Sequence, residues 1–139
     1  MPSDPFQRAQ ARVWIDYSNT RFIDAIYDLL GAKDAAAQAE QAAKLTGCME
    51  YMEDHGLAAL GSDPFWLGTE VSLVDIAYWP FFERLPAVTH YRGVGIPERC
   101  TRLKAWAEAM EARDSVQSTM HQPDYYIQSY SRYAQAAAE

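Results

Sequence analysis

The stretch "VSLVDIAYWPFFERL", residues 71–85, opens with the signals of a helix start. Ser72 is followed three residues later by Asp75, which is the pattern of a capping box with aspartate in place of the usual glutamate. In such a box the serine oxygen accepts the amide of Asp75, and the carboxylate accepts the amide of Ser72. Val71 and Ile76 occupy the flanking hydrophobic positions. The spacing therefore predicts a helix that begins at Ser72.

Pro80 lies inside this predicted helix. It cannot donate to the carbonyl of Ile76 and its ring crowds that turn, so we expect a kink. Apolar residues occur on every side of the segment, which predicts that residues 72–89 form the buried central helix of the fold. A capped, bent core helix without chemistry explains most of the segment. Arg84 is the residue that this explanation does not cover.

Helical patterns continue on both sides of this stretch. Asp4 and Pro5 are typical of an N-cap and a first helical residue, and apolar residues recur at helical spacing from there to a stop at Gly31. A second helix is expected from Asp34 to Ala59. Within it, Gly47 marks either a bend or a close contact between helices.

The second half of the chain has two breaks and two further helical segments. "GSDPFWLGTE" (residues 61–70) and "THYRGVGIP" (residues 89–97) are expected to be loops. A helix is predicted to start at Pro97, and a weaker, tyrosine-rich helix covers residues 124–138. One face of the Pro97 helix carries Cys100, Leu103, Trp106, Ala107 and Met110. The predicted fold class is all-α, a single bundle of five or more helices in one domain, residues 1–139.

The composition of the chain limits the classes of partner and function that are expected. At 139 residues, with 49% hydrophobic residues, the chain can bury a core of its own. A net charge of −7 argues against a nucleic acid or an anionic membrane as partner. No secretory signal or long apolar run is present, so we expect a cytoplasmic protein with Cys48 and Cys100 as reduced thiols.

Metal chemistry has no support in the sequence. His55, His90 and His121 are scattered without ligand spacing, so no metal site is expected. "GVG" at residues 93–95 follows no strand and is interpreted as a loop. The acidic residues at 50–54 are interpreted as a solvated helix face.

Three segments together resemble a known family. "FWLGTEVSLVDIAYWPFFERL" is similar to the central helix of the C-terminal domain of glutathione S-transferases, and its "WPFFERL" part is nearest to the omega class and its bacterial relatives. "DPFQRAQARVWID" resembles the first helix of that domain, and "RLKAWAEAMEARDSV" resembles a later one. The resemblance covers essentially the whole chain, in order.

The resemblance implies that half of a complete transferase is absent. Residue 1 falls where the interdomain linker should end, so the thioredoxin-like half is expected to be missing. That half carries the catalytic nucleophile and most glutathione contacts. Cys48 and Cys100 lie in helical patterns, whereas the family's cysteine lies at a helix N-terminus. No catalytic residue is therefore expected in this chain.

The family also implies which residues line the substrate pocket. Omega-type enzymes take an arginine from the E-R-L motif and a tryptophan from the L-K-x-W motif, which correspond to Arg84 and Trp106. For Arg84 the alternative is a structural salt bridge, and for Trp106 it is core packing. Weaker candidates come from the first helix: Arg12, Trp14 and Tyr17. The tail tyrosines either close the pocket or dock an ordinary helix: Tyr125, Tyr126 and Tyr130.

The expected function follows from these residues. The chain is predicted to be the substrate-binding half of an omega-like glutathione transferase or thiol transferase, for a small hydrophobic electrophile. Alone it should bind no cofactor, and glutathione is the cosubstrate once the missing half is supplied. A non-catalytic interaction module and a small-molecule carrier remain alternatives. A homodimer or a hetero-partner is expected to cover an exposed apolar face formed by Trp14, Tyr17, Tyr78, Trp79 and Phe82.

Overall fold

The computed structural model describes residues 1–60 and 63–135, which form helices and no named β-strand. This confirms the predicted all-α class with five or more helices. Gly61, which opens the first predicted loop, and residues 136–138 of the predicted tail helix lie outside the described residues. No helix in the described part of the chain is long and apolar enough to cross a membrane.

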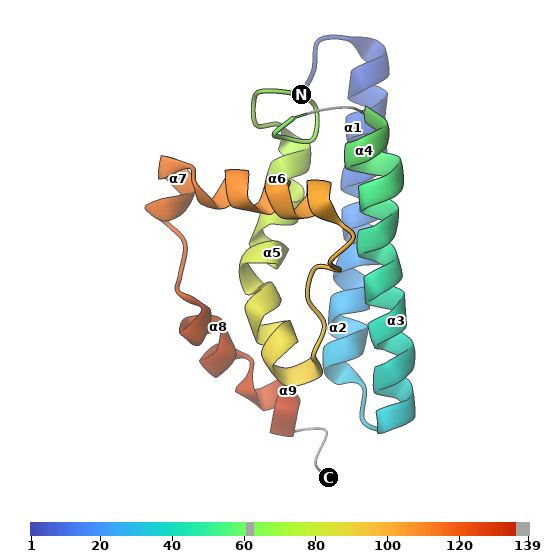
Figure 1. Ribbon diagram of the computed structural model, residues 1–139, viewed down its shortest axis with the longest axis vertical. Helices are drawn as coiled ribbons and strands as arrows, with labels where there is room; N and C mark the ends of the chain where they lie inside the picture. Colours follow the sequence, from blue (N-terminus) through green and yellow to red (C-terminus); the bar gives the residue numbers. More distant parts are fainter. Residues whose placement is uncertain (61–62, 136–139) are drawn as a thin grey trace.

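The first half of the chain is a long antiparallel helical pair (Figure 1). Asp4 and Asp34 cap its two main helices, accepting the amides of Gln7 and Ala37 at 2.8 Å in each case. Both predicted starts are confirmed. In chain order the elements are α1 (Pro5–Tyr17), the π-helical segment η1 (Ser18–Phe22), α2 (Ile23–Gly31), α3 (Ala35–Tyr51), the π-helical segment η2 (Met52–Leu57) and α4 (Ala58–Leu60).

The second half is built on a central helix, α5 (Leu73–Arg92), with α6 (Thr101–Glu111) crossing it (Figure 1). Gly93 ends α5 in the left-handed conformation, φ 72°, which glycine adopts without strain. Three short helices follow in the described part of the chain, and α8 returns along α5: α7 (Asp114–Gln117), α8 (Pro123–Ser129) and α9 (Ser131–Gln135).

The start of α6 differs from the prediction. The helix begins at Thr101, and residues 97–100 form a turn closed by the amide of Cys100 on the Pro97 carbonyl at 3.0 Å. The free amides of the first turn of α6 are taken by Glu53 from η2, whose two oxygens accept Arg102 N at 3.0 Å and Leu103 N at 2.8 Å. The carboxylate of Glu53, which is distant in sequence, therefore acts as the N-cap of α6.

The same contact corrects the prediction of a solvated acidic face at residues 50–54. Glu53 is only 6% exposed, because its carboxylate is buried against α6. Glu50 and Asp54 do lie toward the surface, where both pair with Arg99 at 2.9 and 3.1 Å. The Arg99 guanidinium holds the pKa of Asp54 below its usual value.

The close-packed glycine of this region is Gly56 rather than Gly47. At Gly47 α3 runs through without a break, and a Cβ there would meet nothing within 4 Å. At Gly56, within η2, a Cβ would lie 2.5 Å from the ring of Trp66. Only a glycine allows the indole to lie so close to the backbone at this point.

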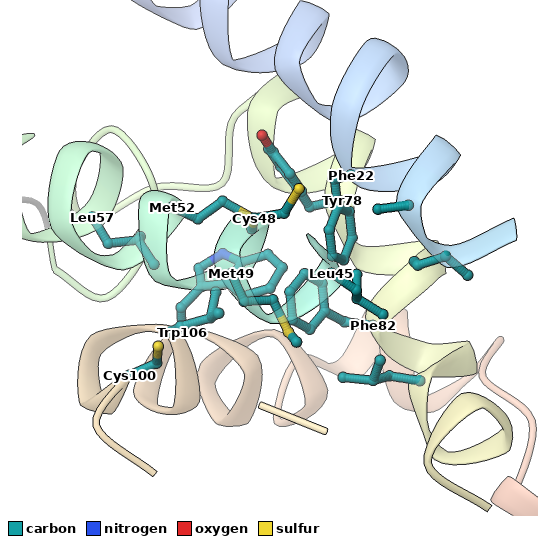
Figure 2. Packing of buried hydrophobic residues seen from close by; sticks show 14 of the residues in the cluster. Phe22, Leu45, Cys48, Met49, Met52, Leu57, Tyr78, Phe82, Cys100 and Trp106 are labelled. Atoms are coloured by element: carbon teal, nitrogen blue, oxygen red, sulfur yellow. The ribbon is translucent and has the colours of Figure 1, made fainter. Parts of the chain in front are cut away.

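The core lies where α2, α3, α5 and α6 meet. Figure 2 shows Met49 of α3 and Phe82 of α5 gathered around Trp106 of α6. Trp66 stacks on Tyr78 with centroids 4.9 Å apart, and the ring of Phe82 meets Trp106 edge-on at 5.0 Å. Pairs of aromatic rings therefore connect α5 both to the loop before it and to α6.

This packing corrects the expected apolar face. Trp14, Tyr78 and Phe82 are 7%, 0% and 6% exposed, so they belong to the core. Tyr17 and Trp79 are half-buried. The large apolar side chains that are exposed lie elsewhere, with Phe6 and Val13 of α1 the most exposed at 71% and 64%.

Candidate functional site

The first turn of α5 contains a fully buried carboxylate. Asp75 is 0% exposed, and its Oδ2 accepts the amide and the hydroxyl of Ser72, both at 2.7 Å. The capping box is therefore formed, as predicted, with Ser72 Oγ accepting from the start of the helix. The other oxygen, Oδ1, accepts the amide of Trp66 at 2.9 Å and the indole N–H of Trp106 at 2.8 Å. Asp75 thus joins the preceding loop, α5 and α6.

Trp106 is placed by this carboxylate. Its indole is 1% exposed, its N–H is bonded to Asp75, and Phe82 packs against its ring. The arrangement is the core packing that the sequence left as the alternative to a pocket wall. In this conformation the indole presents no free face to a ligand.

Arg84 lies on a different side of α5, facing α8. Its Nη1 donates to the carbonyl of Pro80 in its own helix. The guanidinium carbon lies 5.8 Å from the centre of the Phe81 ring and 5.3 Å from that of Tyr126. Within residues 1–60 and 63–135, no carboxylate lies within ion-pair distance of Arg84, so the structural salt bridge considered from sequence is not formed. Most of its five N–H donors remain available.

Glu83 positions the tail helix over Arg84. Its Oε1 accepts the Tyr126 hydroxyl and the backbone amide of His121 at 3.0 Å. Burial, and then the bond to Glu83 and its negative charge, raise the pKa of Tyr126 to about 12. The phenol is therefore neutral at physiological pH and acts as a donor. The two adjacent residues of the E-R-L motif therefore have different contacts. Glu83 binds α8 through hydrogen bonds, whereas Arg84 lies against the Tyr126 ring of α8.

Further tyrosines adjoin this cluster. The hydroxyl of Tyr130, which follows α8, lies 3.5 Å from that of Tyr27 in α2, and burial raises the pKa of Tyr130. Tyr133 of α9 packs on both rings, at 6.3 and 5.4 Å between centroids. We call Arg84, the two rings against its guanidinium and the neighbouring residues that hold or adjoin α8 the Arg84 cluster: Phe81, Glu83, Arg84, Tyr126 and Tyr130. Tyr125, by contrast, is 52% exposed and stacks on His121.

The candidates from the first helix form a separate group. Trp14 and Tyr17 border a hollow of about 280 Å³ between α1 and α3, where the Tyr17 ring stacks on Tyr51 at 5.2 Å. Burial raises the pKa of Tyr17. Arg12 is exposed and does not line this hollow. The structure therefore brings Trp14 and Tyr17 together but places Arg12, Trp106 and Arg84 in three other environments.

Both cysteine thiols lie inside the protein. Cys48 and Cys100 are buried and unpaired with each other. Burial raises the pKa of the Cys100 thiol, which opposes formation of the thiolate that attacks electrophiles. Among the described residues, no group of three or more histidine, cysteine or acidic side chains is arranged to hold a metal ion.

Arg92 is a structural cation that the sequence alone does not predict. At the end of α5 its Nε and Nη2 donate to the carbonyls of Leu29 and Leu30 at 3.1 and 2.8 Å, and Nη2 also reaches the Tyr133 carbonyl at 3.2 Å. It therefore caps the last turn of α2 and fastens α9. No sequence spacing links residue 92 to residue 29, so only the tertiary fold could reveal this role.

The family is shown by comparison with known proteins. A model described as the glutathione S-transferase C-terminal domain matches residues 35–109. A probable glutathione S-transferase parC from Nicotiana tabacum is 31% identical over 122 residues, 86% of this chain and 52% of that protein. Glutathione S-transferase U19 from Arabidopsis thaliana is 30% identical over 124 residues, 89% of this chain and 54% of that protein. The chain belongs to the glutathione S-transferase family, as its helical C-terminal domain.

Solved structures agree with this assignment. Glutathione transferase Omega 3C from Trametes versicolor has a TM-score of 0.79 and 30% identity, covering 99% of this chain and 57% of that one. The tau-class transferase of mango, Mangifera indica, has a TM-score of 0.86 at 23% identity, covering 96% of this chain and 62% of that one, and shows the fold alone. The chain spans about half the length of the curated relatives it matches.

Proposed function

We propose that this domain is the substrate-binding half of an omega-like glutathione transferase or thiol transferase. The observation that carries the proposal is the Arg84 cluster, where a guanidinium that pairs with no carboxylate of residues 1–60 and 63–135 lies near the rings of Phe81 and Tyr126. Such a group can pair with an anionic part of a substrate or polarise its electrophilic centre, while the rings hold its apolar part. The omega-class relative at 30% identity supports the class.

The domain is inactive by itself in this proposal. Glutathione is the cosubstrate, and an activated thiolate comes from a thioredoxin-like half joined to the helical one. Burial, and then the negative charge of Glu53, raise the pKa of the Cys100 thiol, which opposes formation of a thiolate there. A pocket that only binds and orients a small hydrophobic electrophile gives no turnover without that nucleophile.

The test is to join a thioredoxin-like half carrying a C-P-x-x motif ahead of residue 1. The isolated chain should show no glutathione conjugation, dehydroascorbate reduction or thiol transfer above the uncatalysed rate. The joined protein should show one of these activities, and a cysteine-to-serine change in the added motif should abolish it. Turnover by the isolated chain would contradict the proposal. A folded but inactive joined protein would favour the non-catalytic interaction module instead.

We also propose that the protein works in the cytoplasm as a homodimer. The exposed apolar side chains of the first helical pair support this, because Phe6 and Val13 of α1 and Tyr51 of α3 are 71%, 64% and 47% exposed. Burying them against a second copy would remove apolar surface from water. Light scattering over a wide concentration range tests the idea, and a constant monomer mass would contradict it.

A further inference from the structure

A second hollow, distinct from the Arg84 cluster, lies between α5, the segment after it and α6. Its volume is about 520 Å³, which is in the range of small-molecule sites. Trp79, Phe82 and Pro86 line it from α5, spaced three and four residues apart along one side of the helix. Arg84 does not line it, because two residues along a helix turn a side chain to nearly the opposite direction.

The floor of this hollow is mostly apolar, and the hydroxyl group beside it is already bonded within the protein. Phe82 and Leu85 form its base at 6% and 5% exposure, and Trp79 presents a half-buried indole. Thr89 also lines it, but its hydroxyl oxygen lies 3.1 Å from the Leu85 carbonyl and 2.8 Å from that of Val94. Its single proton is therefore used within the protein. A flat hydrocarbon or aromatic body suits such a floor.

The rim has a different character. Lys104, Glu108 and Glu111 lie along one side of α6 and border the hollow. None of their side chains makes a hydrogen bond or an ion pair in the described part of the chain. The rim therefore carries two uncommitted carboxylates and one ammonium on a protein whose net charge is −7. Both the local and the overall charge favour a cation over an anion.

We propose that this hollow binds a small hydrophobic amine. Its aromatic part lies on Phe82 and against the indole of Trp79, and its ammonium group points to Glu108 and Glu111. An ammonium beside Trp79 is also attracted by the face of the indole. A hydrophobic carboxylate binds here more weakly, because two carboxylates face it across the opening.

Three naphthyl compounds of similar size separate charge from hydrophobicity: naphthylethylamine, naphthylethanol and naphthylpropionate. Proton–nitrogen correlation spectra resolve the indole N–H signals of the protein, and Trp79→Phe identifies that of Trp79. We expect the amine to shift the Trp79 signal and to leave the signals of Trp14 and Trp66 in place. The amine should bind about fivefold tighter than the alcohol, which is the gain in affinity expected from one surface ion pair. The carboxylate should bind the hollow most weakly.

Variants complete the test. Glu108→Gln combined with Glu111→Gln should reduce the affinity for the amine to that for the alcohol and leave the alcohol unchanged. Glu40→Gln combined with Glu70→Gln makes the same change in net charge at two exposed positions away from the hollow and should have little effect. Equal affinity of the wild type for amine and alcohol, or an amine that leaves the Trp79 signal unmoved, would overturn the proposal.

Discussion

Two charged side chains in different turns of α5 differ in how much of their hydrogen-bonding capacity is used inside the protein. In the first turn, Asp75 is 0% exposed and both its oxygens are occupied by four donors from the loop, its own helix and α6. Near the middle, Arg84 is half-buried and, within the described part of the chain, makes one hydrogen bond, to its own helix. A charge whose bonding capacity is exhausted inside the protein can only hold the fold. A charge with donors to spare can bind something else.

The largest effect is expected from breaking the Asp75 network. Asp75→Asn replaces an acceptor oxygen by an NH₂ group, which cannot accept the donors that now surround it. We expect the free energy of unfolding to fall by about 3–5 kcal/mol, the range for a broken buried charge network. Urea unfolding measures this. Asp124→Asn changes an exposed aspartate in the first turn of α8 and should stay within about 0.5 kcal/mol of wild type. Equal midpoints for the two variants would show that the network is not formed.

Substitutions of Gly56 and Gly47 form a matched pair, with smaller expected changes in stability than Asp75→Asn. Gly56→Ala places a methyl group 2.5 Å from the Trp66 ring and should destabilise the protein by about 1–3 kcal/mol. Gly47→Ala meets open space in the interior of α3 and should stabilise it by about 0.5–1 kcal/mol. Thermal unfolding of both variants measures the difference. A change of stability in the same direction for both variants would contradict the close contact between Gly56 and Trp66.

The distant cap on α6 should contribute less. Glu53→Gln leaves one acceptor oxygen for two backbone amides and removes the negative charge from a helix N-terminus. A loss of about 1–2 kcal/mol is expected. The neighbouring Glu50→Gln, which loses only a surface pair with Arg99, should cost less than about 0.5 kcal/mol. A larger loss at Glu50 than at Glu53 would contradict the assignment of the cap.

The smallest effect concerns the tail. Tyr126→Phe removes the hydroxyl that bonds to Glu83, so we expect a loss of about 1 kcal/mol and faster hydrogen exchange in α8. Tyr125→Phe removes an exposed hydroxyl without such a bond and is the control. Unchanged exchange in α8 for Tyr126→Phe would show that Glu83 does not fasten the tail.

Local signals in the sequence were sufficient for the all-helical class and for the starts of three helices, but not for the start of α6. Asp4 and the Ser72–Asp75 box act on amides within a few residues, so spacing alone revealed them as caps, and the sequence also placed the start of the second helix at Asp34. Glu53 could not be found in this way, because it caps a helix about fifty residues further on, and an acidic residue beside other acidic residues has the pattern of a solvated face. Arg92 was missed for the same reason.

The site was predictable only through the family resemblance, and then only in part. Arg84 lies where a ligand could reach it, whereas Trp106 is drawn into the core by its bond to Asp75, a partner thirty-one residues earlier. Spacing within one helix indicated that Trp106 faces inward but not whether a pocket or the core lies there. The apolar faces of Trp14, Tyr78 and Phe82 were likewise covered by α3, α6 and the loop before α5, which single-helix patterns do not show.

The claim that Arg84 binds a ligand and does not hold the fold can be tested on this chain directly. The proteins to compare are the wild type, Arg84→Leu and Arg113→Leu. For each, we would measure urea unfolding and the affinity for naphthylpropionate. Binding is followed by the Tyr126 amide signal in all three proteins and also by the Arg84 Nε–H signal in the wild type. Arg113 is the matched control, a half-buried arginine whose guanidinium carbon lies 5.5 Å from the Phe65 ring centre, away from α8. We predict that Arg84→Leu changes the free energy of unfolding by no more than about 1 kcal/mol, the value of an exposed cation–π contact, and weakens probe binding by about tenfold, while Arg113→Leu leaves binding unchanged. A loss of stability comparable to that of Asp75→Asn, with probe binding unaltered, would show that Arg84 is a structural residue.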